Sequence, residues 1–205
     1  MRSGRTDKDR FWAVFVINLI IFIAELLVGL YSGSLTMLSD SFHLSIHVIA
    51  SIVALISEYG FLGLPQEKTK KWSAAVNIFL FFILALVIGN EAWERLLNPK
   101  AVNITIVFFL VGIAGLLANW YTVKVLESSP DEEFSENRDI LFWEMIYDYV
   151  SSIILIACAV IIYFTGWYIL DPILSIVLAL TMVFKAVQMS LRFRSIHHGH
   201  GPHRH

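Results

Sequence analysis

The stretch SDSFHLSIH, Ser39–His47, places charged and polar side chains inside an otherwise apolar run. His43 and His47 are four residues apart, so on a helix their side chains lie on one face, one turn apart. At that spacing two imidazoles can reach the same metal ion. Asp40 precedes His43 by three residues and shares roughly the same face. Ionisable groups are costly to bury in a hydrophobic helix, so by default they mark a functional site.

A second stretch, about a hundred residues later, has the same spacing. In WEMIYD, Glu144 and Asp148 are also at positions i and i+4, and both are potential ligands. We therefore interpret the chain as a helical bundle in a membrane, folded so that the two pairs meet at one metal site.

The composition supports a membrane protein. Of the 205 residues, 57% are hydrophobic and only 16% are charged, whereas a soluble domain has about a quarter charged residues. The mean hydropathy is +0.69. A net charge of −2 gives no sign of nucleic-acid binding. The single cysteine, Cys158, lies in an apolar run and is expected to be a buried apolar residue, with a thiolate ligand as the less favoured alternative.

The hydropathy pattern predicts an all-α polytopic membrane protein with six transmembrane helices. The apolar runs are each long enough for a hydrocarbon core of about 30 Å. The predicted spans cover residues 11–30, 36–57, 72–90, 103–124, 140–165 and 169–190. If the fifth span began earlier, within Phe134–Arg138, Glu144 and Asp148 would lie level with His43 and His47. We expect three regions: a basic N-terminus (1–10), the membrane domain (11–190) and a His-rich tail (191–205).

The basic residues predict the orientation of the helices. Six spans place both termini on one side. Of the 15 lysines and arginines, only Arg95 and Lys100 fall on the other side, which leaves thirteen, Lys185 among them, on the side of the termini. Cytoplasmic loops carry an excess of basic residues, so both termini are predicted to be cytoplasmic.

Further polar groups accompany the spans. Glu25 in the first span is either a proton or cation group or a carboxyl that is hydrogen-bonded inside the bundle. Asp171, followed by a proline, opens the sixth span at the positive end of the helix dipole. Glu25, Asp40 and Asp171 are accessory candidates for the site. Asn119 is expected to form a hydrogen bond between helices, and Gly115 to allow close helix packing.

The C-terminal tail holds five of the seven histidines. We interpret it either as a loose chelating segment for metals that prefer imidazole ligands or as a passive end. The residues concerned are His197, His198, His200, His203 and His205.

Several motifs, in their order and spacing, resemble one membrane family. They are Asn18 and Glu25, Gly33-Ser34-Leu35, Leu38–His43, Asn77, Glu91-Ala92, Arg95-Leu96, Pro99, Gly115, Asn119, Thr165-Gly166-Trp167 and Asp171-Pro172. Over nearly all of residues 12–190 the chain resembles the membrane domain of the cation diffusion facilitator family, the zinc-transporter group of metal/proton antiporters.

The resemblance implies a four-ligand transport site. In that family the second and fifth spans each commonly supply a His-x-x-x-Asp pair. His43 and Asp148 match this pattern, but His47 stands where an aspartate is usual and Glu144 where a histidine is usual. Both arrangements provide two nitrogens and two carboxylates, which suits a tetrahedral divalent ion. The favoured cargo is Zn²⁺, with Cd²⁺, Co²⁺, Ni²⁺, Fe²⁺ or Mn²⁺ as alternatives.

The resemblance also implies metal efflux in exchange for protons by alternating access, without enzymatic activity. The expected partners are divalent metals, protons and the lipid bilayer, and the expected location is the cell (inner) membrane. Since the family's usual C-terminal cytoplasmic domain is missing from this sequence, any homodimer is expected to form through the membrane helices. Two other readings remain open: an intramembrane metalloenzyme, although the chain has no His-Glu-x-x-His motif, and a metal-binding regulatory protein that does not transport.

Overall fold

The computed structural model describes residues 7–58, 66–127 and 135–198 of the chain. Side chains are described for residues 12–49, 52, 72, 75–124 and 146–191. These ranges contain six helices and no strand, which confirms the all-α class. The helices are α1 (Asp7–Ser32), α2 (Leu35–Glu58), α3 (Gln66–Leu97), α4 (Ile106–Glu127), α5 (Ser135–Thr165) and α6 (Leu170–His198).

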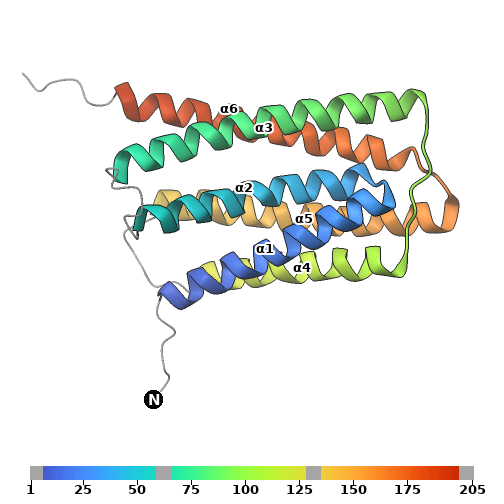
Figure 1. Ribbon diagram of the computed structural model, residues 1–205, viewed down its shortest axis with the longest axis horizontal. Helices are drawn as coiled ribbons and strands as arrows, with labels where there is room; N and C mark the ends of the chain where they lie inside the picture. The colour runs from blue at the N-terminus through green and yellow to red at the C-terminus, as the bar shows by residue number, and fades with distance from the viewer. Residues whose placement is uncertain (1–6, 59–65, 128–134, 199–205) are drawn as a thin grey trace, which may run out of the picture.

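At one end of the bundle, which we call the short-turn end, short turns join α1 to α2 and α5 to α6, and a longer segment joins α3 to α4 (Figure 1). The α1–α2 turn contains Gly33 and the α5–α6 turn contains Gly166, with φ angles of 71° and 68°. In this left-handed region glycine avoids the steric penalty that a Cβ atom brings. Pro99 lies two residues beyond the end of α3, where it prevents the helix from continuing.

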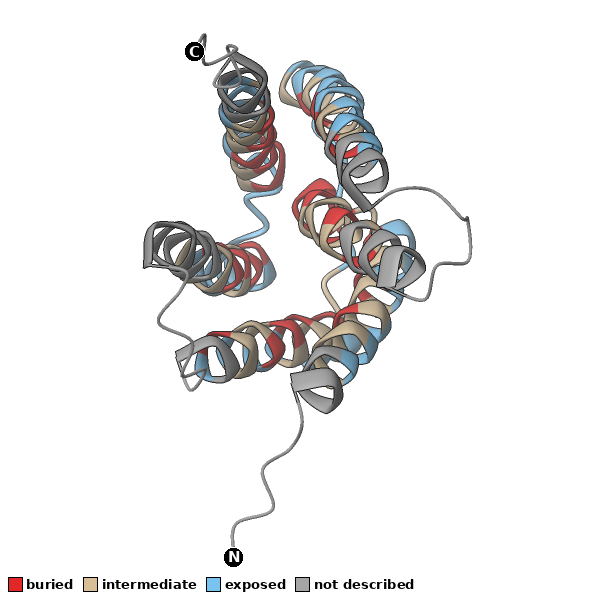
Figure 2. Ribbon diagram, turned by 90° about the vertical axis from the view of Figure 1, so that its left-hand side faces the viewer, coloured by how far each residue is buried: buried red, intermediate tan, exposed pale blue. Residues whose placement is uncertain are grey.

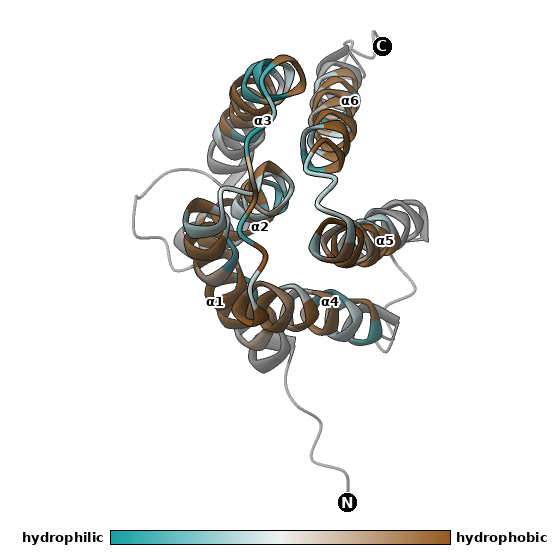
Figure 3. Cartoon of the chain, turned by 90° about the vertical axis from the view of Figure 1, so that its right-hand side faces the viewer, coloured by the Kyte–Doolittle hydropathy of each residue, from teal (hydrophilic) through white to brown (hydrophobic). Residues whose placement is uncertain are grey.

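The helices run roughly along one common direction (Figure 1). Figure 3 looks along the bundle from the short-turn end and shows α3 beside α6 at one side, α1 beside α4 at the other, and α2 and α5 between them. The contacts agree, since α2 packs against α1, α3 and α6, while α5 packs mainly against α4. The interface between α2 and α5 is therefore thin.

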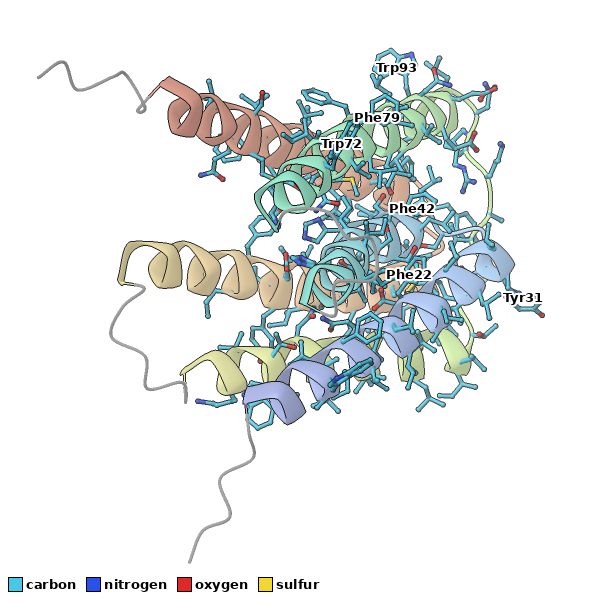
Figure 4. The ribbon with its side chains drawn as sticks, turned by 60° about the vertical axis from the view of Figure 1, so that its left-hand side comes forward. Phe22, Tyr31, Phe42, Trp72, Phe79 and Trp93 are labelled. Carbon is cyan, nitrogen blue, oxygen red and sulfur yellow. The ribbon has the colours of Figure 1, made fainter. Side chains whose placement is uncertain are left out.

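The outer surface of the bundle is apolar. Buried positions face the other helices, whereas much of the outward surface is exposed (Figure 2). On α3 the exposed side chains include Trp72, Phe79 and Trp93 (Figure 4). Trp72 and Trp93 are 21 residues apart, or about 32 Å along a helix, which matches the thickness of the hydrocarbon core. Tryptophans favour the two membrane interfaces, so this pair frames the bilayer.

Within the described residues, five helices are long and apolar enough to cross a membrane: α1, α3, α4, α5 and α6. The remaining helix, α2, has 24 residues and lies among the other five, so it crosses with them (Figure 1). Most of its first half is the polar stretch Ser39–His47, which carries the predicted ligands His43 and His47. The chain is a multi-pass membrane protein.

Two buried clusters hold the helices together. The first joins α2, α3 and α6 through residues such as Phe81, Ile88 and Met182, and the second joins α2, α4 and α5 through Met37, Phe108 and Leu155. In the membrane these contacts stabilise the fold by close packing of the side chains. The hydrophobic effect does not drive the helices together there, because lipid is as apolar as the side chains themselves.

The observed helices extend most of the predicted spans. Residues 140–165 were predicted as the fifth span, but α5 already begins at Ser135. This earlier start lies within the range that brings the two ligand pairs level, and Asp148 does lie beside His43. The sixth helix continues to His198, into the region predicted as tail.

Candidate metal centre

Two helices bring three of the four predicted ligands together. His43 and His47 come from α2 and Asp148 comes from α5. His43 Nε2 lies 3.0 Å from Asp148 Oδ1, and His47 Nε2 lies 3.4 Å from Asp148 Oδ2. One potential ligand atom from each residue falls within 4.8 Å of the others. The carboxylate thus reaches both imidazoles across the thin α2–α5 interface.

Neighbouring side chains fix the orientation of these groups. The two imidazole rings are 5.2 Å apart and nearly perpendicular, at 81°. The ring of His43 also packs against Phe81 of α3, with centroids 5.6 Å apart. On the other side, Asn119 of α4 donates hydrogen bonds to the backbone oxygen of Asp148 (3.3 Å) and to Ser152 Oγ (2.9 Å). Asn119 is therefore the predicted hydrogen bonder between helices, and it holds α5 at the level of the site.

Two imidazole nitrogens and a carboxylate oxygen are the donors that bind Zn²⁺ and similar divalent ions. Glu144, the predicted fourth ligand, lies on α5 one turn before Asp148. Its side chain is outside the described residues, so its part in the site stays a prediction.

The accessory candidates fall in two places. A small cavity is lined by Glu25, Asp40, Asn119 and the three residues of the centre. Glu25 is buried, and no described group donates to its Oε2 atom. Gly115 of α4 makes room for it, because a Cβ atom there would lie 2.3 Å from Glu25 Oε1. Glu25 and Asp40 are therefore neighbours of the centre.

The structure places Asp171 elsewhere, at the short-turn end. Its carboxylate accepts hydrogen bonds from Ser34 Oγ (2.6 Å) and from the backbone N–H groups of Leu35 (2.8 Å) and Thr36 (3.1 Å). These N–H groups belong to the first turn of α2, where a helix lacks internal acceptors. Asp171, at the beginning of α6, thus caps α2 and does not line the cavity of the centre.

Lys185 is the residue of the centre that the sequence analysis missed. It was counted with the basic residues on the side of the termini, but its Nζ atom lies 2.8 Å from His43 Nε2 and 3.1 Å from Asp148 Oδ1. A signal was available: Lys185 follows the apolar run MVF in the last span, and an ionisable residue inside a membrane helix suggests a functional site. The histidines of the tail have no described side chains, so tail chelation stays a prediction.

Comparison with known protein sequences identifies the family of the chain. A sequence model of the cation efflux transmembrane domain matches residues 11–193. The chain belongs to the cation efflux family. This confirms the predicted resemblance, and it argues against an intramembrane metalloenzyme, because the family consists of transporters.

Individual relatives of this cation efflux chain carry the names of zinc or metal cation transport proteins. It is 32% identical over 203 residues to the zinc transporter ZitB of Pectobacterium atrosepticum, covering 93% of this chain and 61% of that protein. It is 30% identical over 166 residues to the metal cation efflux system protein CzcD of Cupriavidus metallidurans, covering 77% and 51%. The proton-coupled zinc antiporter SLC30A1 of Mus musculus is 32% identical over 121 residues, covering 55% and 24%.

Proposed function

We propose that this cation efflux chain exports a divalent metal cation, with Zn²⁺ as the favoured cargo, in exchange for protons. The observation that carries the proposal is the convergence of His43, His47 and Asp148 inside the bundle. The zinc transport named for ZitB and the proton coupling named for SLC30A1 support the choice of cargo and of counter-ion. The chain spans 61% of the length of the ZitB relative, so the activity of that longer protein is carried over here as a proposal.

The ligand chemistry provides the coupling. A histidine binds a metal only when the coordinating nitrogen is unprotonated. Free imidazole has a pKa of about 6.5, so near neutral pH protons and metal compete for the same nitrogen. Metal that binds His43 and His47 from the cytoplasm releases protons, and protons that arrive from the other side displace the metal. Glu144 completes the set with a second carboxylate.

The position of the centre between α2 and α5 supports an alternating-access mechanism. Near the centre, these helices meet largely through the polar groups of His43, His47 and Asp148. α2 is packed with α3 and α6, whereas α5 is packed mainly with α4. In the proposed cycle α2, α3 and α6 rock against α4 and α5, with α1 packed between α2 and α4, and the centre opens first to one side and then to the other.

Orientation and assembly belong to the same proposal. The termini are cytoplasmic, so the short-turn end faces away from the cytoplasm, and the protein resides in the cell membrane. A homodimer forms through the apolar outer surfaces of the membrane helices.

The test is transport by the purified chain in sealed vesicles, with a zinc indicator and a pH indicator enclosed. We expect Zn²⁺ entry to be accompanied by proton exit, and an imposed proton gradient to drive zinc accumulation. Ser45→Ala is a matched control, because Ser45 lies on α2 between the two histidines but donates its hydroxyl hydrogen to the backbone oxygen of Phe42. Zinc binding without flux would support the regulatory alternative, and zinc flux without proton movement would remove the antiport step.

A further inference from the structure

Lys185 enters the candidate metal centre from α6, the third helix to contribute to it. Its side chain is 12% exposed, about as buried as those of His43 (13%) and Asp148 (14%). The Nζ atom is within hydrogen-bonding distance of both residues and lies 5.1 Å from the ring centre of Tyr147. A buried cation thus touches two of the three groups that converge there.

The chemistry of these contacts resembles metal binding. An ammonium group has three N–H donors and no acceptor. A hydrogen bond from Lys185 to His43 Nε2 therefore requires that this nitrogen offers its lone pair. The same lone pair would coordinate a metal, and Asp148 Oδ1 would be the carboxylate oxygen beside it. Lys185 thus uses the same two atoms that a metal would use.

We propose that Lys185 is a resident cation of the centre, which occupies the metal position when the centre is empty and must withdraw before a metal can bind. The inference rests on the proposed function, because it takes His43 and Asp148 as metal ligands. A dication and an ammonium group cannot share the same lone pairs, and their like charges repel at this distance. Lys185 therefore competes with the metal, lowers its affinity and promotes its release.

The surroundings also provide space into which the ammonium can move. A second small cavity lies beside His43 and is lined by Asp40, Tyr147 and Thr181, among others. Tyr147 already faces the ammonium group, and Asp40 is a carboxylate in the same wall. The side chain can leave the metal position by rotating toward the ring of Tyr147 in the wall of this cavity, where the aromatic face receives the ammonium group.

The test is Zn²⁺ affinity, measured by competition with a fluorescent chelator on the purified full chain in lipid nanodiscs at one fixed pH. Lys185→Met removes the charge and keeps an apolar side chain, and we expect it to bind Zn²⁺ at least about tenfold more tightly than the wild type, or about 1.4 kcal/mol. Lys185→Arg keeps a cation and should stay within about threefold of the wild type. Lys100→Met is the matched control, because Lys100 pairs with Glu91 at the exposed short-turn end and should not change the affinity.

Equal or weaker Zn²⁺ binding by Lys185→Met would overturn the inference. If that variant does not fold, a structure of the zinc-bound wild type decides: we expect Lys185 Nζ to lie beyond hydrogen-bonding distance of His43 Nε2, about 3.5 Å, and a retained contact would overturn the inference. Asp148→Ala separates this result from the proposed function. If it binds Zn²⁺ like the wild type, the centre itself is wrongly assigned; if it loses binding while Lys185→Met is unchanged, only the role of the lysine fails.

Discussion

Asp148 is the residue on which the candidate metal centre depends most, because its two carboxylate oxygens face different histidines of α2. Its own backbone oxygen is held by Asn119 and Ser151. The side chain is thus oriented by its own helix and by α4, and its polar contacts reach His43 and His47 of α2 and Lys185 of α6.

The first prediction at this scale concerns the loss of a ligand. Asp148→Ala and His47→Ala should each lower zinc transport in vesicles by more than about 100-fold. The reason is that even groups one shell removed from a metal commonly contribute 10–100-fold. Helical circular dichroism and elution as a single species should stay as in the wild type, with Ser45→Ala as the control. Transport at near wild-type rate by either variant would show that the residue is not a ligand.

The second prediction tests whether His47 and Glu144 compensate each other. His47→Asp alone leaves three carboxylates and one histidine, and Glu144→His alone leaves three histidines and one carboxylate. The double variant restores two of each, the arrangement common in the family. We expect each single variant to bind Zn²⁺ at least about tenfold more weakly than the double variant, as measured by chelator competition. Losses that simply add in the double variant would mean that the two residues do not share an ion.

At the scale of elements, two contacts between helices position the metal centre without involving His43, His47 or Asp148. The first is the cap that Asp171 of α6 provides for α2. Asp171→Asn replaces a charged acceptor with an amide, one half of which can only donate. We expect the variant to lose about 1–3 kcal/mol of stability, seen as a lower melting temperature in detergent, while its zinc affinity stays within about threefold. Glu94→Gln, an exposed change on α3, is the control. A large loss of zinc affinity with unchanged stability would instead indicate that Asp171 contributes to the metal centre.

The second contact is the close approach of α1 and α4 at Gly115. Gly115→Ala would place a methyl group 2.3 Å from Glu25 Oε1, so Glu25 or the helix pair must shift. We expect a loss of about 1–3 kcal/mol of stability, measured by thermal unfolding. Gly112→Ala is the matched control one turn earlier, because its methyl group would meet Ile156 at an ordinary 3.4 Å. Glu25→Ala should relieve the effect of Gly115→Ala, and a purely additive double variant would contradict the proposed clash.

At the scale of the whole molecule, the tail is the part whose contribution can be measured separately. If the termini are cytoplasmic, as proposed, the five tail histidines would raise the metal concentration on the cytoplasmic side, and a tethered chelator acts at an effective concentration of about millimolar. Deletion of residues 197–205 should raise the apparent KM for zinc, mainly at low free metal, and leave the maximal rate nearly unchanged. A passive tail predicts no change in either parameter. A fall in maximal rate at constant KM would indicate a role in the conformational cycle and contradict both readings.

The sequence was sufficient to predict the all-α membrane architecture, and it also predicted three residues that the structure brings close together, for physical reasons. Long apolar runs can only be membrane helices, and the i, i+4 spacing makes His43 and His47 neighbours in any helix. That the pair with Asp148 would meet these histidines was inferred from the matching i, i+4 spacing of Glu144 and Asp148, and the family resemblance implied the same four-ligand site. Sequence spacing could not predict the contact of Lys185 with His43 or the cap by Asp171, because both depend on the rotation of α6 about its own axis, which is set by packing against α3 and α2.

The cap by Asp171 also has a consequence for the order in which the protein is assembled. Asp171 lies 137 residues after Ser34, so during translation α2 emerges and inserts long before its acceptor exists. Until α6 arrives, the first amides of α2 depend on water, which is present at the membrane surface and absent from the hydrocarbon core. A nascent chain that stops before Leu170 already contains His43, His47 and Asp148 but lacks both Asp171 and Lys185. Helix α6 therefore brings the cap of α2 and the resident cation together, and only a chain that includes α6 can hold its centre both fixed in place and occupied without metal.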